Sequence, residues 1–348
     1  MEVVILRNDR SLLPEKYGPQ FSQGRTENYQ DVLDVKKALD RIGVKYKEVI
    51  VKEDLSNLKE LKKLNPDMVI NICDDFLEPK NEALVPKRLE TMGIPYTGDA
   101  YQPLAMCARK ALAKKKLMDS GVTTPRYQLV SSADTKIRGL KYPLIVKPNT
   151  EHGSVGITED SIVHDEQQLQ KKLNEMIHQY GHMLVEEYIE GKEISTVVIG
   201  DKVMRVSEIM FDDKTFEGKP RIMTYESKWE EEGQDYAGTV RKPANLPKQL
   251  EEKIIAESKK AYKALGCRSY ARVDLRLDDK GTPYVLEVNV NPDLSREGAV
   301  AKIAGESRIS YVQLIRMILE NAQQAEQEIP IIGITEQIPE QFEERKAA

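Results

Sequence analysis

Side chains of the kind that bind metal ions interrupt a stretch that otherwise predicts a buried strand, YVLEVNVNP at residues 284–292. Glu287, Asn289 and Asn291 alternate with apolar residues, so all three project from the same face of that strand. Carboxylate and amide oxygens are the ligands that a hard ion such as Mg²⁺ prefers. A strand whose polar face simply lies in water has the same pattern, so this stretch alone leaves both interpretations open.

A second alternating run lies directly before it and predicts the partner strand of a hairpin. Residues 271–277 place Arg272, Asp274 and Arg276 on one face, and a DDKG turn joins this run to residues 283–290. If the two polar faces coincide, two carboxylates, an amide and a guanidinium converge on one small area. The alternative is a surface hairpin held by cross-strand ion pairs, each contributing about 0.2 to 1 kcal/mol.

A glycine-containing loop follows another predicted strand, in PLIVKPNTEHGSVGI. Lys147 ends the strand, and Gly153, Ser154 and Gly156 follow in the loop, where small residues let backbone N–H groups approach phosphate oxygens. Most such loops are ordinary turns. Neither GxxxxGK[ST] nor GxGxxG follows a strand here, which argues against a P-loop and against a dinucleotide-binding fingerprint.

Several carboxylates lie close together in MLVEEYIEGKE, where a Glu-Gly turn joins two predicted strands. They are Glu186, Glu187, Glu190 and Glu193. Carboxylates on a connector between domains can bond to the amino group of adenine or to ribose hydroxyls. A solvated acidic turn explains the same residues equally well.

The elements that must position these residues divide the chain into three regions and a tail. Residues 1–103 alternate strands and helices, which predicts a parallel α/β layer. Residues 104–190 and 191–325 contain strands that alternate apolar and polar residues, which is typical of antiparallel sheets with helices on one side. One continuous helix is expected over residues 103–120. Residues 326–348 form an acidic tail without a regular period.

The composition excludes some classes of function. Among 348 residues, 57 acidic side chains outnumber 52 basic ones and give a net charge of −5, so neither nucleic acid nor a membrane is expected as a partner. No apolar run approaches the roughly 18 residues of a membrane span, and the N-terminus has no basic leader, which predicts a cytoplasmic protein. Cys73, Cys107 and Cys267 are far apart, which predicts buried thiols.

Together these segments resemble the ATP-grasp superfamily, and within it the D-alanine–D-alanine ligases. The resemblance rests on GIPYTGD, AMCARKALAKKKLMDSGVTTP, PLIVKPNTEHGSVGI, MLVEEYIEGKE, ESKW and RVDLRLDDKGTPYVLEVNVNP, in this order. Its most specific part is the pairing of RVD with LEVNxNP after the VExxxxGxE connector, and it covers about residues 60–320. It implies an α/β (α+β) protein of the ATP-grasp fold, in which an N-terminal parallel α/β domain precedes a central and a C-terminal subdomain that grip ATP.

The resemblance also implies an activity. An ADP-forming ligase of this kind joins a small carboxylate substrate, here expected to be an amino acid, to an amine through an acyl phosphate. ATP and two Mg²⁺ ions, with Mn²⁺ as an alternative, are the implied cofactors. Relatives tend to form homodimers, which the sequence leaves open.

Residues at matching positions receive roles from the same resemblance. Arg272 would neutralise the acyl phosphate, Ser154 would close over the γ-phosphate with its loop, and Lys228 in ESKW would reach that phosphate. Asp274, Glu287 and Asn289 would hold the metal ions. The nucleotide would be bound by Lys110, Lys147, Gly153, Gly156, Glu186, Glu193 and the backbone at Glu187 and Ile189.

The chain departs from the ligase pattern on the substrate side. In NPDLSREGAV, which begins at Asn291, Asp293 replaces the oxyanion-hole glycine and Gly298 replaces the acceptor-binding serine. Gly153 and Trp229 replace the serine and the tyrosine of the family's Glu-Ser-Tyr triad. We therefore expect an acceptor other than D-alanine, either cationic or without a carboxylate.

Three other functions stay open at this point. The chain could be an authentic D-alanine–D-alanine ligase of cell-wall synthesis, or a non-catalytic ATP-binding regulator on the same scaffold. The retained metal set and Arg272 argue against the regulator, because nucleotide binding alone would hardly require them. A third alternative, an NAD-dependent dehydrogenase, is disfavoured by the missing glycine fingerprint.

Overall fold

A small parallel sheet forms the N-terminal region. The computed structural model describes residues 1–9, 29–74, 76 and 80–327, and its first sheet has the order β2-β1-β3 with parallel pairing throughout, which confirms the predicted parallel α/β layer. Apolar residues fill β1 and β3 because helices pack on the sheet, whereas β2, at one edge, is mostly polar and exposed. The elements are β1 (Glu2–Asn8), α3 (Gln30–Ile42), β2 (Lys45–Val51), η2 (Ser56–Glu60), α4 (Leu61–Leu64), β3 (Met68–Asn71) and α5 (Lys80–Met92).

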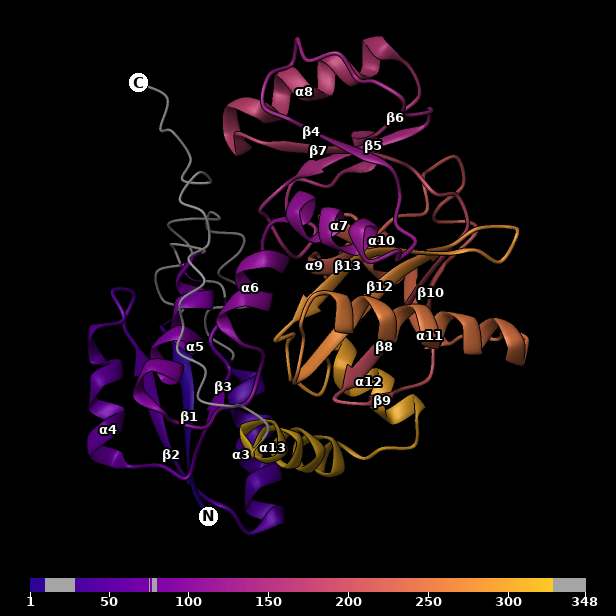
Figure 1. Cartoon of the computed structure of the whole chain (residues 1–348). Coiled ribbons are helices and arrows are strands. Elements are labelled where there is room, and N and C mark those ends of the chain that lie inside the picture. Colours follow the sequence, from indigo (N-terminus) through magenta and orange to yellow (C-terminus); the bar gives the residue numbers. More distant parts are fainter. Residues whose placement is uncertain (10–28, 75, 77–79, 328–348) are drawn as a thin grey trace.

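A four-stranded antiparallel sheet forms the central region, at the top of Figure 1. One long helix covers it, α8 (Glu166–Tyr180), and packs Leu169, Leu173 and Met176 into the core beneath. Asp165 begins this helix by accepting a hydrogen bond from the backbone of Gln168 at 2.8 Å. In sheet order the strands are β4 (Tyr127–Val130), β7 (Met183–Glu187), β5 (Leu144–Pro148) and β6 (Ile162–Val163), and η3 (Glu159–Ser161) precedes β6.

The third region contains the largest sheet, whose two faces differ in chemistry. One face is apolar and packs against α11 (Lys248–Ala264). Part of the other face packs against the last two helices and the N-terminal region. The rest of that face carries the polar residues of the predicted site. The strands, in order, are β11 (Thr239–Pro243), β10 (Ser207–Phe211), β8 (Lys192–Ile199), β12 (Tyr270–Leu277) and β13 (Pro283–Val290), with β9 (Lys202–Val203) beside β8.

Four further helices lie around this sheet. The loop after β10 contains two short helices, α9 and α10, of which α10 packs against β11. Two helices after β13 close the chain against the N-terminal region. These elements are α9 (Tyr225–Trp229), α10 (Gln234–Ala237), α12 (Ala299–Glu306) and α13 (Tyr311–Gln327). Among the described residues, no helix is long and apolar enough to cross a bilayer.

The single helix expected over residues 103–120 is wrong, because the chain forms two helices there. They are α6 (Tyr101–Cys107) and α7 (Lys110–Asp119), separated by an extended Arg109. The first free N–H groups of α7 bond to Asn149, at 3.0 Å from Lys110 to its carbonyl and 2.9 Å from Ala111 to its side chain. The break therefore fixes the start of α7 against the glycine-containing loop.

Candidate active site

The predicted hairpin forms, and its polar faces coincide. In the β12–β13 register Arg272 lies opposite Asn289, and Asp274 lies opposite Glu287. The Asn289 Nδ2 atom donates to Asp274 Oδ2 at 2.7 Å and to Glu287 Oε1 at 3.3 Å. Arg272 binds Asp274 through two nitrogens, Nε and Nη2, each at 2.8 Å from a carboxylate oxygen. The four side chains thus form one contiguous cluster. We call this cluster, formed by Arg272, Asp274, Glu287 and Asn289, the floor of the site.

Two lysines from the central region lie within electrostatic reach of this floor. Lys110 begins α7 and donates to the Glu151 carbonyl, while Lys147 lies near the end of β5. Burial alone would raise the pKa of Glu287, but the attraction of Lys110 and Lys147 outweighs it and brings that pKa to about 2. Burial lowers the pKa of Lys110, and Glu287 opposes that effect. The cluster therefore combines ionised carboxylates with buried cations.

Glu186 is almost completely buried between two lysines. Its Oε1 lies 2.5 Å from Lys147 Nζ and its Oε2 lies 2.8 Å from Lys114 Nζ. Burial would raise the pKa of Glu186, but Lys114 and Lys147 hold it below its ordinary value. Lys114 was not identified from the sequence, although it lies one helical turn after Lys110, and that i, i+4 spacing was the available signal.

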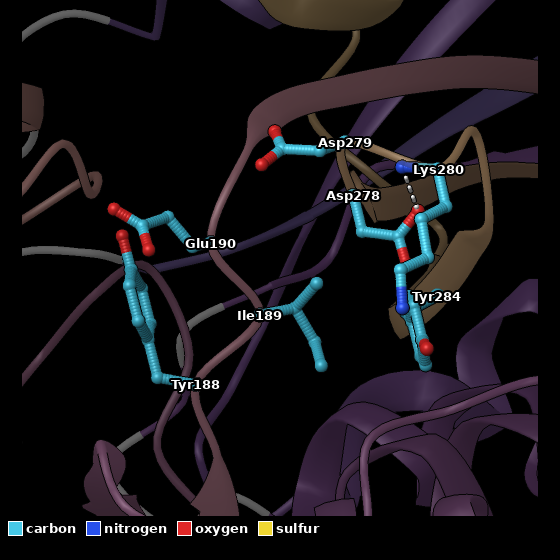
Figure 2. Close-up of a pocket in the computed structure, with 7 residues that line it drawn as sticks. All are labelled: Tyr188, Ile189, Glu190, Asp278, Asp279, Lys280 and Tyr284. Carbon is cyan, nitrogen blue, oxygen red and sulfur yellow. Dashed lines mark hydrogen bonds between the residues drawn. The ribbon is translucent and has the colours of Figure 1, made fainter.

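The connector between the central and C-terminal regions contains the remaining predicted nucleotide residues. Glu187 turns outward to Arg126, at 3.0 Å from its Nε. Glu193 accepts from Arg276 Nη2 at 3.1 Å, and burial raises the pKa of Glu193 despite this partner. Ile189 lines an open pocket of about 250 Å³, shown in Figure 2. The other lining residues are Tyr188, Glu190, Asp278, Asp279, Lys280 and Tyr284.

The glycine-containing loop and the loop that contains Lys228 are bonded to each other. Trp229 Nε1 donates to the Gly153 carbonyl at 2.7 Å, and Ser154 Oγ donates to the Met223 carbonyl at 2.8 Å. A backbone bond of 3.0 Å from Tyr225 to Ile157 adds a third link. These contacts place the segment with Lys228 against the glycine-containing loop.

Glycines in this loop are required by backbone shape and by space. Gly153 and Gly156 both have positive φ angles, of 65° and 74°. A Cβ atom at Gly156 would lie 2.8 Å from the Pro148 side chain, so only glycine fits there. Ser154 also has a positive φ, of 65°, which a serine adopts at some cost in strain.

Three of the predicted substrate residues, Asn291, Asp293 and Gly298, follow β13 in the chain. Asn291 is buried and accepts from the Tyr270 hydroxyl at 2.9 Å, so its amide contributes to a contact with the fold. The Asp293 carboxylate accepts two bonds from Ser295, at 2.8 Å from its backbone and 2.6 Å from its hydroxyl. A Cβ atom at Gly298 would lie 2.6 Å from Asp293 Oδ2, so a side chain there would require the carboxylate to move.

The floor has the donor set of a magnesium site that a phosphate completes. Within the described part of the chain, no group of three or more His, Cys, Asp or Glu residues is arranged to hold a metal ion alone. The set here is two carboxylates and one amide, and these groups lie within hydrogen-bonding distance of one another. Mg²⁺ usually binds through one or two carboxylates plus water and substrate phosphate. Asp274, Glu287 and Asn289 therefore fit Mg²⁺.

Comparison with known proteins points to one family. Residues 117–320 match the family model described as D-ala D-ala ligase C-terminus. An uncharacterized protein, y4sG, from Sinorhizobium fredii is 34% identical over 73% of this chain and 74% of its own length. A D-alanine–D-alanine ligase from Bacillus anthracis is 33% identical over 67% of this chain and 73% of its own length.

Solved structures of such ligases share the fold. A crystal structure of D-alanine–D-alanine ligase from Bacillus anthracis complexed with ATP superposes with a TM-score of 0.73 and 23% identity, covering 94% of this chain and 99% of that one. The VanG D-Ala:D-Ser ligase from Enterococcus faecalis gives a TM-score of 0.67 and 19% identity, covering 92% and 99%. At these identities the likeness establishes the ATP-grasp fold.

Proposed function

The chain belongs to the D-alanine–D-alanine ligase family, and from that premise we propose that it is an ATP- and Mg²⁺-dependent ligase that joins a carboxylate to an amine. The observation that carries this proposal is the contiguous cluster of Arg272, Asp274, Glu287 and Asn289 beneath Lys110 and Lys147. Ionised carboxylates beside buried cations suit a nucleotide triphosphate with its metal. We assign residues 1–103 to a substrate domain, 104–190 to a central subdomain that covers ATP, and 191–325 to the catalytic subdomain.

The proposed reaction has two steps. An oxygen of the donor carboxylate forms a bond to the γ-phosphorus of ATP, and ADP leaves with the electron pair of the broken P–O bond. The amine nitrogen then attacks the acyl carbon, the bond from that carbon to the bridging oxygen breaks, phosphate leaves with this oxygen and the electron pair, and the nitrogen loses a proton to give the amide. Lys110, Lys147 and Lys228 would neutralise phosphate charge, and Arg272 would stabilise charge on the acyl phosphate.

Asp274, Glu287 and Asn289 would hold Mg²⁺, which when bound neutralises phosphate charge and orients the phosphates. The two bonded loops would exclude water from the acyl phosphate, because the links from Trp229 and Ser154 place them against each other. Glu186, Ile189 and Glu193 would bind the adenosine part. Glu186 would reach an adenine amino group only if that group replaces a lysine contact, since both its oxygens face lysines.

On the acceptor side, we propose an amine that is cationic or has no carboxylate. The Asp293 carboxylate contributes a negative charge near Arg272, and its Oδ2 fills the space beside Gly298. A second carboxylate there would be repelled, at a cost that rises as water is excluded. This acceptor distinguishes the chain from a ligase that joins two D-alanines.

The test is ATP-dependent phosphate release with Mg²⁺ across D- and L-amino acids, amines and short peptides. Release that requires one carboxylate and disappears in Asp274→Ala is the expected result. Formation of D-alanyl-D-alanine at a comparable rate would refute the altered acceptor while keeping the ligase. Nucleotide binding without release on any partner would instead favour the regulator on the same scaffold.

A further inference from the structure

A third arginine lies on the polar face of the large sheet and was not identified from the sequence. Arg241, on β11, lies opposite Ile209 of β10. Ile209 in turn lies opposite Glu193 of β8, and Glu193 lies opposite Arg276 of β12. Residues directly opposite one another in an antiparallel sheet project from the same face. Arg241 therefore projects from the same face as the predicted nucleotide and metal residues.

The guanidinium of Arg241 has a buried donor without a partner. Its Nη1 atom is buried and makes no hydrogen bond with any part of the chain that the structure describes. The charged groups around it are Arg272, Asp274, Glu306 and Glu193. Asp274, Glu306 and Glu193 attract Arg241, but Asp274 forms its ion pair with Arg272 and Glu193 forms its ion pair with Arg276. Glu306 also has a buried oxygen, Oε2, without a partner.

A buried hydrogen-bond donor without an acceptor is costly, and on a cation such a donor suits a site that binds an anion. Burial, followed by repulsion from Arg272, lowers the pKa of Arg241, which shows that two like charges lie close together here. A carboxylate or phosphate placed between the two guanidinium groups would satisfy the free donor and reduce the repulsion. Two ligands of the proposed reaction carry such an anion, the nucleotide and a substrate.

Position in the sheet favours the substrate. Lys110 and Lys147 act on Glu287 of β13, at one edge of the sheet, whereas β11 is the opposite edge. Helix α12, which begins after Asp293 and Gly298, packs against β11 and β8. Arg241 thus lies on the side of the floor away from the lysines proposed to bind phosphates.

We propose that Arg241 binds a second carboxylate of the donor, so that the donor substrate is a dicarboxylate. This inference rests on the proposed ligase function and makes its substrate class specific. One carboxylate reacts beside Arg272, and the other is held by Arg241. The acceptor is not the source of this anion, because Asp293 already places a negative charge on the acceptor side.

The test compares Arg241→Met with Lys242→Met. Lys242 is the neighbouring cation on the same strand, it is exposed, and it projects from the other face, so it controls for the loss of one charge. Binding of aspartate and glutamate, with alanine and glycine as monocarboxylate controls, is measured by calorimetry in the presence of Mg²⁺ and a non-hydrolysable ATP analogue. We expect Arg241→Met to weaken binding of a dicarboxylate at least tenfold and to leave the affinity for the ATP analogue unchanged. Lys242→Met should change neither affinity.

The melting temperature separates a binding role from a structural one. Because Arg241 has an unpartnered buried donor, Arg241→Met should melt at or above the wild-type temperature. A lower melting temperature with unchanged dicarboxylate binding would refute the inference. Weaker binding of the ATP analogue alone would also refute it, as would a wild-type protein that binds no dicarboxylate. If Arg241→Met weakened binding of the amine substrate alone, the anion would belong to the acceptor, and this result would also refute the inference. Arg241-dependent binding without phosphate release would leave this inference standing and refute the ligase.

Discussion

Replacing Trp229 by phenylalanine removes the hydrogen bond that its indole donates to the glycine-containing loop. The bond from its Nε1 to the Gly153 carbonyl is 2.7 Å long, and phenylalanine keeps the aromatic contact but has no donor. A neutral hydrogen bond contributes about 0.5 to 1.5 kcal/mol net, which corresponds to a change of about 2- to 13-fold in the ratio of closed to open loops. If the reaction occurs only with the loops closed, kcat/KM should fall by the same factor.

The assay for this bond needs no label, because Trp229 is the only tryptophan in the chain. We expect its emission to shift when Mg²⁺ and a non-hydrolysable ATP analogue are added to the wild type. Phosphate release then compares Trp229→Phe with Trp229→Ala, which also loses the ring contact and should be slower still. Tyr236→Phe, an exposed aromatic in the same segment, is the matched control and should behave as wild type. Full kcat/KM in Trp229→Phe would refute the reasoning.

Three further predictions concern buried charges. Lys114→Met leaves the buried Glu186 with one lysine and should cost about 3 to 5 kcal/mol of unfolding free energy, measured by denaturant titration; an unchanged midpoint would contradict the pairing. Because the pKa of Glu287 is lowered from 4.5 to about 2, its stabilisation is complete above about pH 4.5 and is lost as the pH falls toward 2. Acid unfolding should show a loss on the order of 3 kcal/mol in that window, absent in Glu287→Gln. Arg276→Met removes the buried partner of Glu193 and should weaken binding of the ATP analogue about 10- to 100-fold, measured by calorimetry. An unaltered affinity would show that Glu193 does not bind the nucleotide.

The floor of the site was predictable because its signal is local. Alternating residues and a DDKG turn determine the hairpin. An irregularity between Asp274 and Leu275 then shifts the register by one residue, and this shift brings Asp274 opposite Glu287. The prediction of the hairpin and its shared polar face is confirmed, whereas the register shift was not predicted from the sequence.

Lys114 and Arg241 could not be found in the same way. Lys114 has the spacing of an ordinary surface lysine on a helix, but in the fold it is buried against Glu186 on a distant strand and Thr124. Arg241 lies on a short strand whose face is determined by pairing with β10 and β8, a contact between distant segments. The division of the expected helix at Arg109 has the same kind of cause, since Asn149 in the next region binds the first N–H groups of α7.

The cations of the site also predict how stability should depend on ligands. Lys110 has a pKa lowered by burial, and so has Arg241, because each is removed from water without full neutralisation. The folded chain neutralises these charges only in part, and any anion that binds the folded chain must stabilise it by mass action. At a concentration 100 times its Kd, a ligand contributes about 2.7 kcal/mol. The ATP analogue should protect through the lysines near β13, and a dicarboxylate through Arg241 near β11. Because the two sets of cations lie at opposite edges of the sheet, their protective effects should add in the wild type, and Arg241→Met should remove the second alone.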